Sequence, residues 1–177
     1  MSYEMIKNKR ASNRIWSVTA LVLAALLTWI AVQTHRTAGA FAFPLSQMEI
    51  ARADGTKASF RIEVATSPQQ QERGLMFRKK LAPDAGMLFL WPQDQPVSMW
   101  MKNTVIPLDM LFVAHSGVIT KVIANAVPYD LTPLSSDGLV RAVIEIGGGE
   151  AARKNIKVGD RVLYSAFVES TTKDVLK

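Results

Sequence analysis

After residue 42 the chain consists of short apolar or alternating segments that are separated by turn-forming residues. Phe60, Ile62 and Val64 alternate with polar neighbours, which is the pattern of a strand with one buried face. Asp54-Gly55, just before that segment, is a strong hairpin signal. About seven or eight such segments, with two helices of one or two turns, predict a mainly β fold, either a small sandwich or a partly closed barrel.

The two predicted helices are marked by their ends. Ser67-Pro68 has the residues of a helix start and Gly74 that of a helix end, so the first helix covers residues 68–73. Three consecutive glycines lead into the second, over residues 150–154. Two proline-containing segments are expected to be a turn, at residues 92–96, and a long loop, at residues 128–138.

The first 42 residues are of a different kind. A basic region comes first, then residues 15–32 carry no charge, and small-x-small sequences end at Ala40 and Ala42. This order is typical of a secretory signal peptide. An uncleaved membrane anchor helix is the alternative, because about 18 apolar residues reach the lower limit for spanning a bilayer. The basic region contains Lys7, Lys9, Arg10 and Arg14.

The positive flank is expected to stay on the cytoplasmic side of the membrane, and the chain after the apolar segment is expected to emerge on the opposite side. We therefore expect residues 43–170 to form one β-rich domain that is periplasmic or secreted, or tethered to the inner membrane if the segment is uncleaved. Residues 171–177 are expected to be a loose tail.

Charge and composition exclude several classes of protein. The net charge is +6, but residues 1–42 hold five basic residues and one acidic residue, which leaves 16 basic and 14 acidic residues in the rest. A domain this balanced lacks the basic footprint of a nucleic-acid binder. The chain has no cysteine, and His115 is the only histidine after residue 42. The sequence therefore predicts no metal or cofactor and shows no recognisable catalytic machinery.

Several segments together resemble a known family, and the Trp-Met-Lys-Asn-Thr segment is the most specific of them. The set resembles the domain-of-unknown-function family DUF192, small bacterial and archaeal proteins that often carry signal peptides. The resemblance covers residues 48–168. It implies a mainly β, sandwich-like fold and is in keeping with export of the protein. It implies no activity. The matching segments are residues 72–78, 86–89, 100–104, 106–109, 145–146 and 157–160.

The resembling segments also hold the candidate site. Lys102 could bind an anion, Asn103 could form two hydrogen bonds, and Trp100 offers a flat face for stacking. The alternative is a turn in which the polar residues bond the local backbone. We expect a cleft for a small polar or anionic ligand or an envelope glycan. Its candidate residues are Arg73, Met76, Met87, Trp100, Lys102, Asn103, Asp109 and Glu145.

Two other functions stay open. An envelope hydrolase could use Asp109 or Glu145 with Lys102, since a pair of carboxylates can act as acid and base. Each carboxylate could instead pair with an arginine or with backbone amides. The protein could also be a structural or interaction protein without a ligand. The same polar side chains would then be buried, with their hydrogen bonds made within the protein.

Overall fold

The computed structural model describes residues 21–30 and 42–167, and the chain divides into two units, Met1–Ala42 and Phe43–Lys177. In the first unit residues 21–30 are helical. Among the described residues, no helix has both the length and the apolar character needed to cross a bilayer. The predicted basic flank, the cleavage sequences up to Phe41 and the tail at 171–177 lie outside the described residues.

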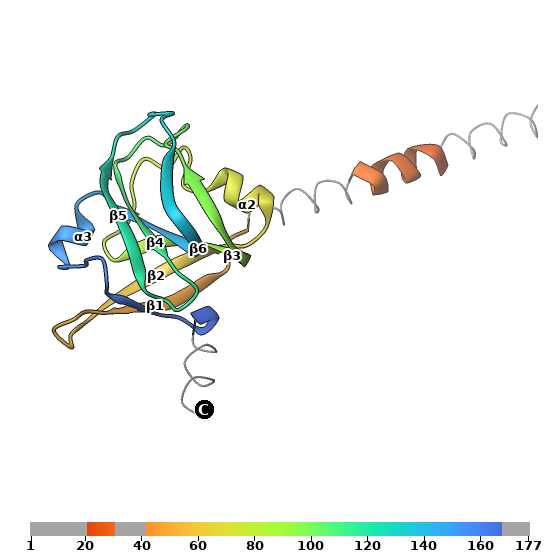
Figure 1. Ribbon diagram of the computed structural model, residues 1–177. Coiled ribbons are helices and arrows are strands. Elements are labelled where there is room, and N and C mark those ends of the chain that lie inside the picture. Colours follow the sequence, from red (N-terminus) through yellow and green to blue (C-terminus); the bar gives the residue numbers. More distant parts are fainter. Residues whose placement is uncertain (1–20, 31–41, 168–177) are drawn as a thin grey trace, which may run out of the picture. The chain divides into compact units, whose positions relative to one another are not determined.

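The second unit is built on one seven-stranded sheet with the strand order β5-β4-β6-β3-β2-β1-β7. The sheet curls (Figure 1), and an isolated bridge between Val118 and Arg161 joins its two edge regions at one end. The mainly β class is confirmed, and the curled sheet has the form of a partly closed barrel rather than a sandwich. The strands are β1 (Leu45–Ala51), β2 (Lys57–Ala65), β3 (Ala85–Met99), β4 (Leu108–Val113), β5 (Ile119–Ala126), β6 (Leu134–Gly147) and β7 (Arg161–Leu163).

Two short helices connect these strands, as the sequence predicts: α2 (Pro68–Arg73) and α3 (Glu150–Arg153). In α2 the Ser67 hydroxyl accepts a hydrogen bond from the Gln70 backbone N–H, and the Gln70 side chain accepts one from the Ser67 N–H. This reciprocal pair is a capping box, which fixes where the helix begins.

Two predicted connections are shorter than expected. Residues 92–96 are an irregularity within the 15-residue strand β3, where the register with β6 shifts. Strand β6 already begins at Leu134, so it takes up the second part of the loop predicted over residues 128–138. In both places the pairing of β3 with β6 extends the strands, and at residues 92–96 it overrides the local preference of two prolines for a turn.

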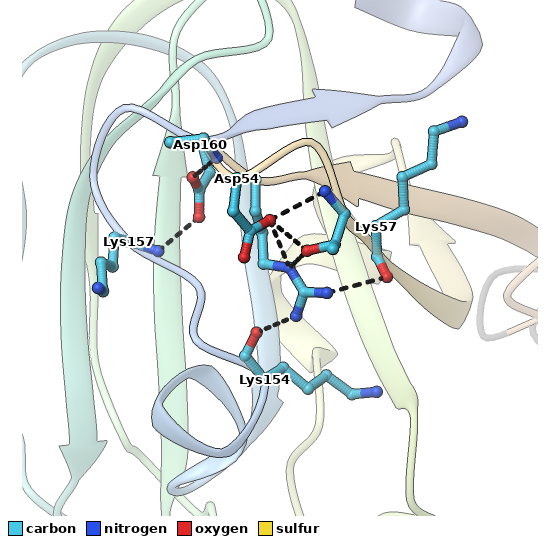
Figure 2. A network of polar contacts seen from close by, with 8 residues as sticks. Asp54, Lys57, Lys154, Lys157 and Asp160 are labelled. Carbon is cyan, nitrogen blue, oxygen red and sulfur yellow. Dashed lines mark hydrogen bonds and ion pairs between the residues drawn. The ribbon is translucent and has the colours of Figure 1, made fainter.

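The β1–β2 hairpin is tied to the far end of the chain (Figure 2). Arg52 Nη1 donates to the Lys154 carbonyl over 2.5 Å, and the Asp160 carboxylate accepts from the Ala53 and Lys157 backbone N–H groups over 3.1 and 2.8 Å. Asp160 is buried, so the two hydrogen bonds that its carboxylate accepts are partly shielded from water. The predicted turn at residues 157–160 is thereby anchored beside the hairpin.

The sheet is apolar on both faces. Along β6, Ala142, Ile144 and Ile146 belong to one buried cluster, while Val143 belongs to a second one on the opposite face. The second cluster also contains Leu75, just after α2, and Met101, just after β3. The second face is therefore covered by α2 and by the segment that follows β3, and the candidate site lies there.

Candidate functional site

A cavity of about 340 Å³ opens between α2, β3, β6 and the segment 98–104. Five of the eight predicted site residues line it, which are Arg73, Met76, Trp100, Lys102 and Glu145. The other three, Met87, Asn103 and Asp109, are not in its lining. The remaining lining residues are Gln71, Glu72, Gly74, Leu75, Phe89, Trp91, Ser98, Met99 and Thr104.

The wall formed by α2 depends on a glycine. Gly74 ends the helix with a φ of 44°, and its backbone passes so close to Phe89 that a Cβ atom there would lie 3.1 Å from the ring. A larger residue would meet both the left-handed backbone and the Phe89 ring. Gly74 thus lets Leu75 enter the buried cluster while Arg73 and Met76 line the cavity.

Glu145 lies in the central strand β6, directly between two methionines. It is paired in register with Met87 of β3 and with Met110 of β4, and both methionines are fully buried. Residues opposite each other in neighbouring strands point to the same face of a sheet. The Glu145 side chain therefore lies among apolar groups at the base of the cavity, with only 4% of the residue exposed.

No hydrogen-bond or ion-pair partner for the Glu145 carboxyl group occurs among the residues that the structure describes. In the same part of the chain, every side-chain oxygen or nitrogen that is sealed from solvent has a partner. The Glu145 oxygens therefore reach the cavity rather than being enclosed.

Burial raises the pKa of Glu145 from 4.5 to about 8. The cause is desolvation, because an apolar surrounding disfavours the charged form of a carboxyl group. At neutral pH the group is mainly a protonated acid. It can then both donate and accept a hydrogen bond within the cavity.

The rim of the cavity combines aromatic rings with positive charges. Lys102 Nζ lies 5.3 Å from the centre of the Trp100 ring, and the Arg73 guanidinium lies 4.8 Å from the centre of the Phe77 ring. Trp100 is half exposed, with 51% of its surface open to solvent. Behind it, buried Thr104 donates from its hydroxyl to the Lys102 carbonyl over 3.2 Å.

Asp109 has a different role from the one predicted. It is fully buried, and its two oxygens accept hydrogen bonds from the backbone N–H groups of Asn125, Gly149 and Ala151 at 2.8, 3.0 and 2.8 Å. These bonds join β4 to the end of β5 and to the start of α3. The carboxylate is thus satisfied by backbone amides, which is one of the two alternatives that the sequence leaves open.

Met87 and Asn103 support the site from outside its lining. Met87 is fully buried beside Glu145, where it contributes to the apolar surroundings of the carboxyl group. Asn103 has a φ of 55°, its amide nitrogen lies 3.9 Å from the Met76 sulfur, and its carbonyl accepts from the Phe77 N–H over 2.8 Å. Its positive φ suits a turn residue between Lys102 and Thr104. Its side chain contacts Met76, however, so only Thr104 bonds the local backbone as the alternative predicts.

Sequence reasoning did not single out several lining residues, chiefly Glu72, Trp91 and Ser98. A signal for two of them exists in the spacing. Trp91 follows Phe89 by two residues and Ser98 precedes Trp100 by two, which is the repeat of residues on one face of a strand. Glu72 lies within the matching segment 72–78, but neither its type nor its spacing points to a cavity.

Metal ligands are not gathered here. Across residues 21–30 and 42–167, no group of three or more His, Cys, Asp or Glu side chains is arranged to hold a metal ion. His115 instead lies in a surface cluster, where its Nδ1 is 2.6 Å from Arg141 Nη2 and 3.3 Å from Asp94 Oδ1.

Two solved structures are similar to this chain. A protein of Sinorhizobium meliloti 1021, described as a candidate transcription regulator, is 38% identical with a TM-score of 0.69, over 71% of this chain and 97% of its own. A protein of unknown function from Novosphingobium aromaticivorans DSM 12444 is 43% identical with a TM-score of 0.65, over 68% of this chain and 85% of its own.

A comparison with curated proteins gives no match. The family model of DUF192, described as "Uncharacterized ACR", matches residues 49–164. This match includes α2, the segment 98–104 and Glu145, so it contains every residue that lines the cavity. With the model covering well over half of the chain, the protein belongs to the DUF192 family.

Proposed function

We propose that the protein is an exported binding module whose cavity takes a small ligand carrying both an acidic group and hydroxyl groups. The observation that supports this most is the Glu145 carboxyl group, which lies in an apolar surrounding, has no partner among residues 21–30 and 42–167, and reaches an open cavity. A buried polar group without a partner costs stability. A ligand hydroxyl that bonds this carboxyl group would remove that cost.

The rim favours an acidic ligand. Arg73 and Lys102 both line the cavity and can pair with a carboxylate or phosphate group. Trp100 adds a half-exposed flat surface against which a ring can pack. A volume of about 340 Å³ lies at the lower end of the range for small-molecule sites. An acidic sugar combines these three features, namely a negative group, hydroxyl groups and an apolar ring face.

The description of the S. meliloti neighbour suggests DNA binding as another role. Recognition of DNA depends on neutralising several phosphates with clustered lysines and arginines. The chain after residue 42 has only two more basic than acidic residues, which is little net positive charge for binding a duplex. The charge of the domain therefore favours binding of a small ligand over binding of double-stranded DNA.

Calorimetric titration of the domain with galacturonic, glucuronic and N-acetylmuramic acids tests the proposal, with glucose as the neutral control. We expect one of the acids to bind, and Glu145→Leu to weaken that binding about tenfold or more because the hydrogen bond is lost. Lys102→Ala should weaken it as well. Lys157→Ala is the matched control, since Lys157 is exposed at the turn before β7 and outside the cavity lining. Equal binding by all variants, or none by the wild type, would contradict the proposal.

Hydrolysis is a second candidate, favoured by one observation. Glu72 lines the same cavity as Glu145, whose pKa is raised to about 8. A protonated Glu145 could give its proton to the leaving oxygen of a glycosidic bond while Glu72 takes a proton from the water that attacks the sugar carbon. New reducing ends formed from oligogalacturonate by the wild type, and absent with Glu145→Gln, would establish this. If the wild type forms none while it binds the sugar, the protein only binds.

A further inference from the structure

Three exposed aromatic side chains lie in or next to the segments that line the cavity. Phe77, Trp100 and Tyr129 are 54%, 51% and 60% open to solvent. They come from three separate segments, after α2, after β3 and between β5 and β6. Large rings normally contribute to stability by being buried, so their exposure does not help the fold.

Backbone hydrogen bonds bring the three segments together. The Phe77 N–H donates to the Asn103 carbonyl over 2.8 Å, and the Tyr129 N–H donates to the Thr104 carbonyl over 3.2 Å. The Met101 N–H donates to the Asp130 carbonyl over 2.9 Å. The segment 100–104, which lines the cavity, therefore adjoins the chain at Phe77 and the chain at Tyr129.

Two of these aromatic residues have a backbone conformation that bulky side chains avoid. Phe77 has a φ of 64° and Tyr129 a φ of 63°, both in the left-handed region. Asn103, which lies between them in the hydrogen-bonded arrangement, has a φ of 55°. Strained positions of this kind persist when the surrounding structure holds them, and they cluster at ligand sites. Here the strain and the exposure occur in the same side chains.

Positive charge accompanies two of the rings. The Arg73 guanidinium is placed over Phe77 and the Lys102 ammonium over Trp100. An extended surface with aromatic faces and spaced positive charges fits a chain of ring-shaped units that carry negative groups. Single-stranded nucleic acid has this character too. An acidic oligosaccharide fits better, because the protonated Glu145 at the base offers a partner for hydroxyl groups and the domain has little net charge.

We infer that the ligand is an acidic oligosaccharide, with one unit in the cavity and neighbouring units on the rings of Phe77 and Tyr129. This inference rests on the proposed function and names its ligand class. The cavity alone would hold a single small unit, whereas the three rings extend the contact surface over the segments beside it. Each added contact within one chain acts at a high effective concentration and raises the affinity.

The test compares galacturonic acid with its linear hexamer by calorimetric titration. The informative variant is Phe77→Asn/Tyr129→Asn, because asparagine tolerates a positive φ while it removes the ring. We expect the wild type to bind the hexamer about tenfold or more tightly than the monomer. In the double variant that ratio should fall to about one, with a melting temperature equal to or above that of the wild type.

A control and three contrary outcomes complete the design. Val158→Asn removes a side chain of similar exposure, 60%, at the turn before β7, and should leave the ratio unchanged. Equal affinity of the wild type for monomer and hexamer, or an unchanged ratio in the double variant, overturns this inference alone. Failure to bind either sugar overturns this inference, and overturns the proposed function as well if glucuronic and N-acetylmuramic acids also fail to bind. Tighter binding of a single-stranded oligothymidine than of the hexamer would assign the surface to nucleic acid.

Discussion

Glu145 and Asp109 show how two similar side chains acquire different roles. Both are acidic residues in apolar strands and both are buried. Asp109 accepts hydrogen bonds from three backbone N–H groups. Glu145 instead faces the cavity between two methionines, and burial raises its pKa to about 8. The difference arises from the sheet face to which each points, because adjacent positions of a strand alternate between its faces. Only Glu145 is therefore placed to meet a ligand.

Glu145 should make stability depend on pH. Its folded pKa of about 8 exceeds the ordinary value of 4.5 expected in the unfolded chain, so the folded protein binds more protons between these pH values. The free energy of unfolding should then fall by about 1.4 kcal/mol per pH unit as pH rises through this window. Glu145→Gln removes that dependence. Urea denaturation should show the variant gaining stability over the wild type at pH 8.5, about half a unit above this window, but little at pH 5, close to its lower end.

The matched control for this prediction is Glu49→Gln, an exposed carboxylate that pairs with Lys57 on the hairpin. Its difference from the wild type should not change between the two pH values. Parallel pH profiles for the wild type and Glu145→Gln would show that the carboxyl group is not held in an apolar surrounding.

At the scale of elements, α2 and α3 are positioned by quite different means. The start of α2 is fixed locally, by the capping box of Ser67 and Gln70. The start of α3 has no side-chain cap of its own, and Gly149 at that position has a φ of 83°. Asp109 of β4 takes that role from a distant part of the chain, by accepting from Gly149 and Ala151. One helix is thus encoded by neighbouring residues and the other by tertiary contact.

Asp109→Ala should therefore destabilise the domain. It leaves three backbone N–H groups without their acceptor, that of Ala151 buried and those of Asn125 and Gly149 partly buried. A buried group of this kind costs about 1–3 kcal/mol. We expect a loss of about 3–5 kcal/mol in the free energy of unfolding, measured by urea denaturation. Asp109→Asn, which keeps one acceptor oxygen, should lose less. Asp137→Ala changes a carboxylate that is 72% exposed and should have little effect.

This series also separates structure from ligand binding. If Asp109 acts only on the fold, the folded fraction of Asp109→Asn should bind the acidic sugar as the wild type does. If Asp109→Asn keeps the stability of the wild type but no longer binds the sugar, Asp109 takes part in ligand binding.

At the scale of the whole molecule, the two units have separate roles in the proposal. The first unit carries the basic residues and the uncharged run of 18 residues, and the second unit carries the cavity. We propose export on the order of charge, apolar run and small residues in the first unit. The absence of cysteine means that the exported domain would rely on packing, and the buried clusters on both faces of the sheet supply it.

Export can be tested with the full chain in a Gram-negative host. We expect the domain in the periplasmic or membrane fraction, where protease digests it after the outer membrane is opened. Leu26→Arg interrupts the uncharged run and should keep the protein in the cytoplasm. Leu45→Arg, at an 80% exposed leucine of β1, is the control and should not change the location. N-terminal sequencing then distinguishes cleavage near Ala40 or Ala42 from an intact anchor. Cytoplasmic recovery of the wild type would contradict export.

Much of the fold could be predicted from local patterns. The hairpin at Asp54-Gly55, the limits of α2 and the strand around Ile144 depend on residues close together in sequence, so the chain itself indicates them. The long strand β3 could not be predicted, because the pairing with β6 carries it through a segment with two prolines. For the site, Trp100 and Lys102 could be proposed from residue type, whereas Glu72 could not.

The amino-acid sequence alone determined the β class, the short helices, the family and the polar residues that a site requires. The tertiary structure alone decided which of these residues share a cavity and which support the backbone. The physical reason is that a strand residue's neighbours are set by register and by the curl of the sheet. Register places Glu145 between Met87 and Met110, and pairing of distant segments brings residues 101–104 beside the chain at Phe77 and at Tyr129.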